Sequence, residues 1–179
     1  MKKDIKIIIA THKKYEMPKE KMYIPVHVGA DGKDDLGYIK DNSGDNISKK
    51  NPFFCELTGL YWAWKNLNAD YIGLAHYRRH FSIKKKSNDK FENVLTEQQL
   101  QKILEKTDVV LTKKRKYYIE NLYSHYKHTM YIEPLDETGK IIEEIYPEYS
   151  AYFNKLHKRT SAHMFNMFIM SRKKCNEYC

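Results

Sequence analysis

Two adjacent arginines, Arg78 and Arg79, end a polar cluster that also contains His76 and Tyr77. The cluster directly follows the short apolar run of residues 71–75. Guanidinium groups bind phosphate oxygens through paired hydrogen bonds, and two of them could stabilise negative charge on a leaving diphosphate. Arginines at a strand end can instead pair with surface carboxylates. Because ligand sites of open α/β sheets lie where strands end, the position of this pair favours diphosphate binding.

A second basic run, residues 113–116, also follows an apolar segment. Its Lys114 and Arg115 are therefore candidates for the same diphosphate. The lysines at 84–86 lie in a polar stretch that has no apolar period, which is typical of a solvated loop.

Glu56 and Asp45 are the carboxylates that we consider as catalytic groups. Glu56 lies among apolar neighbours in a predicted helix, where a carboxylate costs free energy unless it is paired. It is therefore either bound to a cation such as arginine, or a sugar-binding or catalytic group. Asp45 and Asn46 belong to the polar loop before this helix and could bind sugar or ribose hydroxyls. Alternatively, and with equal weight, the loop and the helix start are an ordinary capped helix after a polar loop, with no ligand site.

Histidines give weaker signals. His163 and Asn166 interrupt an apolar run, where polar groups are more often satisfied by the backbone than by a ligand. His125 and His128 have the spacing of two metal ligands on one helix face, but we find no carboxylate pattern beside them and predict no metal site. The sequence contains neither GxSxG nor GxxxxGK[ST], so it gives no support to a hydrolase or P-loop function.

The composition limits the classes of partner that the protein is expected to bind. The chain has 32 Lys and Arg against 23 Asp and Glu, a formal net charge of +9. Such a charge is typical of proteins that bind nucleic acid, an anionic membrane or a phosphate-bearing small molecule. The sequence contains no paired Cys/His finger and no RNP-type aromatic motif, so we expect no nucleic-acid partner. Phosphate binding in a pocket is the preferred interpretation, with peripheral contact to an anionic membrane as an addition.

Length and composition predict one folded domain over residues 1–179, because 41% hydrophobic residues suffice for a core. No apolar run approaches the ~18 residues of a membrane span, and Lys and Asp interrupt the first six residues where a signal peptide would be apolar. We therefore expect a cytoplasmic protein, peripheral at most at the inner face of the membrane. Cys55, Cys175 and Cys179 form no CxxC pair, which argues against a disulfide framework or a cysteine-based zinc site.

Alternating strands and helices must position these residues. The predicted strands are residues 5–10, 23–28, 71–75 and 108–111, with a final strand within residues 162–170, and the predicted helices are residues 51–67, 96–104, 118–130, 137–145 and 147–157. Asn51 is expected to cap the first helix, Thr96 to open the second with a capping box, and Pro25 to lie toward a sheet edge. The pattern predicts an α/β fold with a mostly parallel sheet flanked by helices.

The sequence resembles a bacterial family that is long catalogued as a domain of unknown function and is associated with capsular and exopolysaccharide gene clusters. The matching segments are ATHK at 10–13, VGA at 28–30, GDNIS at 44–48, CELTGLYWAWKN at 55–66, YIGLAHYRR at 71–79, YYIE at 117–120, YSHY at 123–126 and HMFNMF at 163–168. The resemblance implies a GT-A-like (Rossmann-like) glycosyltransferase. It also implies transfer of a galactose-type hexose, pyranose or furanose, from a UDP-sugar to a lipid-linked glycan acceptor.

With this function, the residues that follow the first two strands should surround the nucleotide. The expected substrate-binding residues are Thr11, His12, Lys13, Gly29, Ala30, Asn46, His76, Tyr77, Arg78, Arg79, Lys114, Arg115, His163 and Asn166. An inverting transfer needs a carboxylate base within ~3 Å of the acceptor hydroxyl, and Glu56 and Asp45 are the candidates. A non-catalytic basic module that binds an anionic glycan or a membrane surface is the alternative.

The sequence departs from the family pattern in two respects. GT-A enzymes typically carry an Asp-x-Asp metal motif, and this chain contains none. We therefore expect arginine, helped by Lys114 and Arg115, to neutralise the diphosphate without a divalent metal or other cofactor. Family members usually continue with more helical sequence, so the chain is expected to lack a C-terminal helical part.

Overall fold

The computed structural model describes residues 2–83, 88–89 and 91–179. The lysines at 84–86, predicted to form a solvated loop, lie outside the described residues. The chain forms two compact units, one made of Met1–Thr112 with Asn166–Cys179 and the other of Lys113–Phe165. The expectation of a single domain over 1–179 stays a prediction, because compactness does not show whether the two units fold separately.

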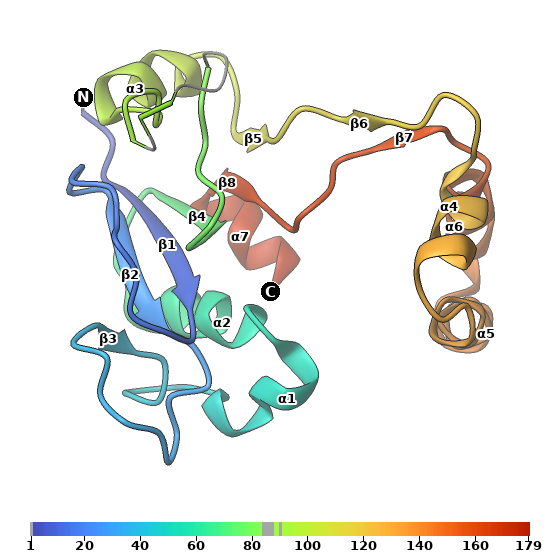
Figure 1. Cartoon of the computed structure of the whole chain (residues 1–179), viewed down its shortest axis with the longest axis horizontal. Coiled ribbons are helices and arrows are strands. Elements are labelled where there is room, and N and C mark those ends of the chain that lie inside the picture. Colours follow the sequence, from blue (N-terminus) through green and yellow to red (C-terminus); the bar gives the residue numbers. More distant parts are fainter. Residues whose placement is uncertain (1, 84–87, 90) are drawn as a thin grey trace. The chain divides into compact units, whose positions relative to one another are not determined.

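The first unit is built on a six-stranded sheet in the order β3-β2-β1-β4-β8-β5 (Figure 1). Its strands are β1 (Ile5–Thr11), β2 (Tyr23–His27), β3 (Ile39–Lys40), β4 (Tyr71–His76), β5 (Val109–Leu111) and β8 (Phe168–Ser171). The first four are parallel, whereas β8 is antiparallel to both β4 and β5. The strand of Pro25, expected toward a sheet edge, is the second strand of the sheet. Pro25 pairs with Ile9 of β1, and only Val26 and His27 of β2 pair with the edge strand β3. The predicted mostly parallel α/β sheet is confirmed.

Helices cover both faces of this sheet. Ile5, Ile7 and Ile9 of β1 belong to one core, which includes Leu100 and Leu104 of α3 (Glu97–Leu104). The alternate residues of β1 belong to a second core with α2 (Leu57–Asn66) and α7 (Arg172–Tyr178). A strand buried on both faces explains the nearly continuous apolar run of the sequence. The capping box of Thr96 is confirmed, since its side chain accepts from Gln99 N and the Gln99 side chain accepts from Thr96 N.

The predicted helix over 51–67 is interrupted. A 3-10 turn η1 (Ser48–Lys50) leads into α1 (Asn51–Phe54), and α2 begins only after Cys55, which has φ 47°. The prediction that Asn51 is the N-cap was wrong, because Lys50 holds that position. The Asn51 amide instead donates to Cys55 O and Thr58 Oγ1 across the break, at 2.7 and 3.1 Å.

The final strand that the sequence predicts within 162–170 is found as β8, and the short strand β7 precedes it. β7 (Ser161–Ala162) belongs to the second unit, and β8 begins at Phe168 in the first. Between them, Phe165 and Asn166 have φ values of 75° and 51°. Successive left-handed residues cannot continue a strand, which explains why β7 and β8 are separate.

The second unit contains a short ribbon and three helices. β6 (Arg115–Lys116) pairs antiparallel with β7, and the helices are α4 (Leu122–Thr129), α5 (Glu133–Ile145) and α6 (Pro147–His157). The three predicted helices of this region are confirmed with shifted ends. No residue of 113–165, all of which are described, is fully buried. No helix in the described part of the chain is long and apolar enough to cross a membrane.

Candidate active site

The strand order reverses at β1, and this point lies between the groups that we expected to bind a ligand. β2 lies on one side of β1 and β4 on the other, and all three run parallel. Ala10 and His76 are register partners, and Tyr77 N donates to Ala10 O at 3.3 Å. The carboxyl ends of β1 and β4 therefore lie side by side, at the position where open α/β sheets bind ligands.

Tyr77 is the centre of an aromatic and cationic cluster at these strand ends. The rings of His12 and Tyr15 contact its ring edge-on, with centroids 5.4 and 5.2 Å away. Lys13 Nζ and Arg78 Cζ lie 5.4 and 5.2 Å from its centroid, within the range of cation–π attraction. Tyr77 itself is buried, whereas His12, Lys13 and Arg78 are exposed. The cluster thus holds cationic side chains at the surface, where they can meet an anion.

Arg78 and Arg79 lie in a tight turn that ends β4. Arg79 N donates to His76 O at 2.9 Å, and His76 N donates to Arg79 O at 3.3 Å. Both arginines are exposed. Lys114 and Arg115 are also exposed but lie in the second unit, so their contribution to a shared diphosphate site stays a prediction.

Glu56 contacts two other predicted site residues. Asn166 Nδ2 donates to Glu56 Oε1 at 3.2 Å, and His76 Nε2 lies 3.9 Å from the same oxygen. Side chains alternate along β4, so His76 lies on the same face as Ile72 and Leu74, which pack against α2. The Glu56 and His76 side chains are 24% and 21% exposed, so a ligand can reach them. Three segments distant in sequence therefore converge on one carboxylate.

Unusual backbone surrounds this carboxylate. Cys55 precedes Glu56 with φ 47°, and Asn166, which donates to Glu56, has φ 51°. Such conformations cost of order 1 kcal/mol or more for residues other than glycine, and they cluster at functional sites. Glu56 also occupies the N-cap of α2, where the helix dipole favours a negative charge. These features make Glu56 the strongest candidate for a catalytic base.

Asp45, the other candidate, lies near the opposite end of α2. Its backbone contacts Asn66, the last residue of that helix, and its carboxylate accepts from Tyr61 OH at 3.1 Å. Ten residues of helix span about 15 Å, so the structure does not bring Asp45 to Glu56. Asn46 closes the local turn, accepting from Ser48 N and donating to Gly44 O.

Asp41, which no sequence pattern indicated as a site residue, is fully buried. Its carboxylate accepts from Gly29 N at 2.8 Å and Ala30 N at 3.0 Å. It also accepts from Ser48 Oγ at 2.5 Å and Thr58 Oγ1 at 2.6 Å. The amides of Gly29 and Ala30, which we expected to lie around the nucleotide, thus have an internal acceptor that ties the loop to α2.

Gly29 is required in this arrangement by its backbone and by its neighbour. It has φ +62°, and a Cβ atom there would lie 2.3 Å from Asn51 Oδ1. Thr11 likewise acts locally, since its hydroxyl donates to Lys13 O at 2.6 Å and shapes the turn after β1. Thr11 and Gly29 thus shape the local backbone, and their contact with a substrate stays a prediction.

A carboxylate does lie beside the histidine pair of the second unit, contrary to our expectation. Glu120 contacts His125 Nδ1 at 3.0 Å and also His128 Nδ1. Hydrogen bonds from His128 and His125 lower the pKa of Glu120 below its ordinary value. His163, the remaining predicted site residue, is exposed in the same unit.

The strand-end residues do not fit a divalent cation of the kind that GT-A enzymes use. Mg²⁺ and Mn²⁺ prefer carboxylate and carbonyl oxygens, whereas the ends of β1 and β4 present His12, Lys13 and Arg78. Among the residues that the structure describes, no group of three or more His, Cys, Asp or Glu is arranged to hold a metal ion.

The comparison with protein families identifies the chain. A family model described as "Domain of unknown function (DUF4422)" matches residues 6–179. The chain belongs to the DUF4422 family. An apo structure of the WbbM bifunctional glycosyltransferase is similar to this DUF4422 chain, with a TM-score of 0.83 and 32% sequence identity. The similarity covers 98% of this chain and 35% of that chain. No curated protein matches the sequence.

These findings confirm the resemblance to a family of unknown function whose members are similar to glycosyltransferases. They also confirm the GT-A-like α/β fold, since the six-stranded sheet with flanking helices matches that of the glycosyltransferase. The DUF4422 chain spans about a third of the length of that relative.

Proposed function

We propose that the protein is a glycosyltransferase that moves a galactose-type hexose from a UDP-sugar to a lipid-linked glycan in capsular or exopolysaccharide synthesis. The observation that carries this proposal is the likeness of almost the whole chain to part of a bifunctional glycosyltransferase at 32% identity. The reaction would take place in the cytoplasm, at the inner face of the membrane. The basic surface of the protein would assist contact with anionic lipid.

Glu56 is the base in the proposed reaction. Its carboxylate accepts the proton of an acceptor hydroxyl while that oxygen bonds to the anomeric carbon of the donor sugar. The bond from the anomeric carbon to the phosphate oxygen breaks, and UDP leaves with the electron pair, inverting the configuration. Asn166 and His76 contact Glu56 Oε1 and fix its position, which is what a base needs to meet its proton.

Cations of the strand-end cluster stabilise the leaving diphosphate. Lys13, Arg78 and Arg79 supply positive charge without a metal, and Tyr77 supports the first two by cation–π contacts. We expect UDP to raise the melting temperature of the protein, and excess EDTA to leave this shift unchanged. A ligand at 100 times its Kd stabilises by about 2.7 kcal/mol, which a thermal-shift assay detects.

The arginines give the sharper test. The double variant Arg78→Ala with Arg79→Ala should lose most of the UDP-induced shift, whereas Arg159→Ala, an exposed arginine of the second unit, should keep it. A different outcome would support the alternative hypothesis of a basic binding module. In that case UDP gives no shift, and the double variant and Arg159→Ala weaken the binding of any polyanion to a similar degree. An absolute requirement for Mn²⁺ would contradict the metal-independent part of the proposal.

A further inference from the structure

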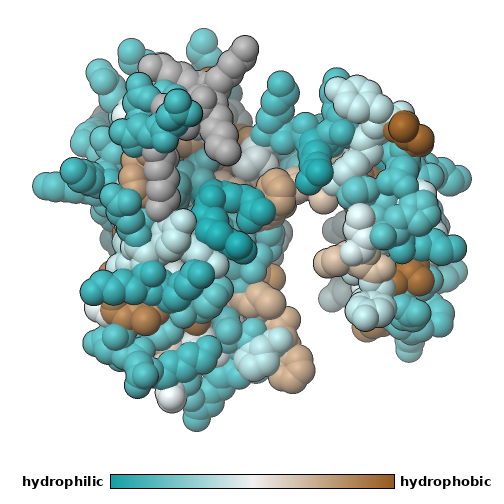
Figure 2. Space-filling model, viewed as in Figure 1, coloured by the Kyte–Doolittle hydropathy of each residue, from teal (hydrophilic) through white to brown (hydrophobic). Residues whose placement is uncertain are grey.

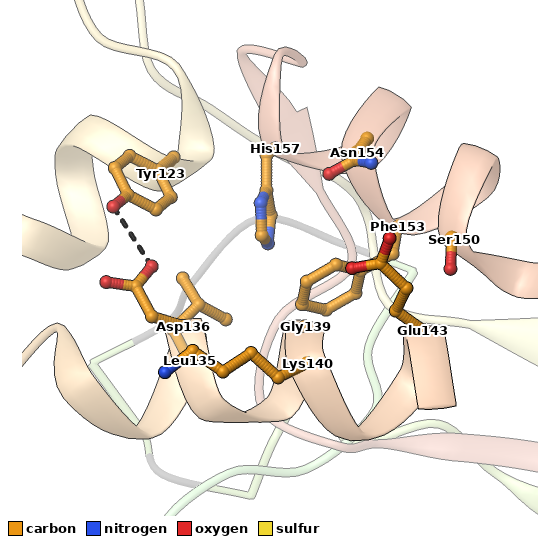
Figure 3. A pocket seen from close by; sticks show the side chains of 10 residues that line it. All are labelled: Tyr123, Leu135, Asp136, Gly139, Lys140, Glu143, Ser150, Phe153, Asn154 and His157. Carbon is orange, nitrogen blue, oxygen red and sulfur yellow. Dashed lines mark hydrogen bonds between the residues drawn. The ribbon is translucent and has the colours of Figure 1, made fainter. Parts of the chain in front are cut away.

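A cavity of the second unit has no part in the function proposed above. It has a volume of about 280 Å³, lies between α5 and α6, and is bordered by Tyr123 of α4. Figure 3 shows the His157 imidazole and the Glu143 carboxylate directed toward the space between these helices, with Phe153 between them. Asn154 and Ser150 also line it. Polar groups from two helices thus converge on one small space.

Two polar atoms of this cavity lack hydrogen-bond partners. Ser150 Oγ and His157 Nε2 are both buried, and neither has a partner in the described structure. A buried polar atom without a partner destabilises a protein, so such atoms in a native structure usually bind a water or a ligand. Burial lowers the pKa of His157, against the opposing effect of Asp136. Burial therefore favours the neutral imidazole, whose Nε2 can donate or accept a hydrogen bond, depending on the tautomer.

The charge of the cavity argues against a phosphate. Asp136 and Glu143 are carboxylates, and the cationic Lys140 is already paired with Glu137 at 2.6 Å. Asp136 also accepts from Tyr123 OH at 3.0 Å, which fixes both side chains (Figure 3). A site with this balance repels an anion and suits a ligand whose hydroxyl groups can donate to carboxylates.

The shape of the cavity suits one ring. Ligand pockets for drug-sized molecules have volumes of about 300–1,000 Å³, so 280 Å³ is too small for a nucleotide sugar but sufficient for a hexose. The Phe153 and His157 rings contact each other, with centroids 4.2 Å apart, and Phe153 supplies an apolar wall. Gly139 keeps that wall close to α5, because a Cβ atom there would lie 3.1 Å from Phe153 Cε1. A glycine inside a helix costs about 1 kcal/mol relative to alanine, so its presence needs such a reason.

We propose that this cavity binds one uncharged sugar ring of a glycan. Glu143, Asn154, Ser150 and His157 bind its hydroxyl groups, and Phe153 contacts its apolar face. The assignment of this sugar to the acceptor glycan rests on the proposed glycosyltransferase function, whereas sugar binding as such does not.

The test uses the full chain and a panel of methyl glycosides of the common hexoses and N-acetylhexosamines. Saturation-transfer NMR should detect saturable binding of at least one glycoside, and the His157 imidazole signals should shift with the same Kd. Glu143→Gln should weaken binding about tenfold or more, whereas Glu144→Gln, on the neighbouring exposed position of the same helix, should leave it unchanged. His157→Phe provides a second variant, and melting curves of all variants identify any that fail to fold.

The outcomes separate the two proposals. Glycoside binding that is lost in Glu143→Gln, while UDP still stabilises that variant, supports the sugar site. Absence of binding across the panel overturns the sugar site and leaves a cavity filled by water. The same conclusion follows if Glu143→Gln and His157→Phe both bind the glycoside as tightly as the unmodified protein. Failure of UDP to bind while a glycoside binds would overturn the proposed transferase and leave the sugar site standing.

Discussion

The two units of the chain differ most in how they bury apolar side chains. All of the fully buried hydrophobic residues lie in the first unit, on both faces of its sheet. The second unit leaves large side chains exposed, including Tyr118 at 91%, Ile119 at 98% and Tyr131 at 85%. Hydrophobic residues at its surface are coloured brown in Figure 2. The first unit is therefore stabilised by a core, and the second by partial contacts among short elements.

This difference bears on where each kind of chemistry can occur. A reacting group must be held within a fraction of an ångström, and the packed sheet of the first unit supports Glu56 in that way. The second unit has an open cavity and polar atoms without partners, which a bound ligand would satisfy. Under the two proposals, the first unit would perform catalysis and the second would bind a sugar ring.

The largest expected difference concerns two carboxylates, one in each unit. Asp41→Ala leaves the amides of Gly29 and Ala30 and two hydroxyls without their buried acceptor. We expect it to lower the free energy of unfolding by about 3–5 kcal/mol, measured by urea denaturation. Glu120→Ala, which removes a surface carboxylate between two histidines, should change it far less. Equal losses would show that the first unit does not depend on its buried acceptor.

Truncation of an aliphatic side chain should also destabilise the protein more in the first unit than in the second, but the difference should be smaller. Leu74 has no exposed surface, and Leu74→Ala should cost about 2–5 kcal/mol because it removes buried contacts and leaves a cavity. Ile141 is 52% exposed, so Ile141→Ala should cost less than about 1 kcal/mol. The melting temperatures of the two variants would distinguish these costs. A larger loss of stability from Ile141→Ala would mean that the second unit also depends on a packed core, which would contradict the comparison of the two units.

The smallest expected effect concerns pH. Burial and the charge of Lys33 lower the pKa of His27, whereas Asp41 opposes them, with smaller effects of Lys40 and Asp35. The unfolded chain therefore binds a proton more readily at this histidine than the folded chain does. The free energy of unfolding should be unaffected above the ordinary histidine pKa of about 6.5 and should fall as the pH decreases below it. In His27→Gln, the free energy of unfolding should fall less between pH 7 and 5 than in the unmodified protein. The same pH dependence in both proteins would contradict the assignment to His27.

The sequence predicts the regular elements of the first unit well, because local signals specify them. The apolar run of β1 and the capping box at Thr96 each depend on neighbours within a few residues. The helices of the second unit follow in the same way from periodicity and from Pro134 and Pro147 in their first turns. The order of the strands and the reversal of β8 depend on tertiary pairing, which one sequence does not encode locally.

The helix that the sequence predicts as continuous over 51–67 is broken directly before Glu56. Cys55 interrupts the helix, and its residue type does not signal an interruption in this context. The unusual backbone at Cys55 and Asn166 lies beside the hydrogen bond between Glu56 and Asn166, which are 110 positions apart in the sequence. Local rules fail most often at strained or functional sites. Asp41 escaped prediction for a similar reason, since its four donors are brought together only by the folded loop.

The most direct test of the account is the rate of UDP release from UDP-galactose in the presence of a glycan acceptor, compared between Glu56→Gln and Asp45→Asn. Removal of a general base typically costs about 10²–10⁴-fold in rate. We predict a loss in that range for Glu56→Gln, with an unchanged melting temperature, and a rate close to that of the unmodified protein for Asp45→Asn. Full activity of Glu56→Gln, or an equal loss in Asp45→Asn, would contradict the central role of Glu56.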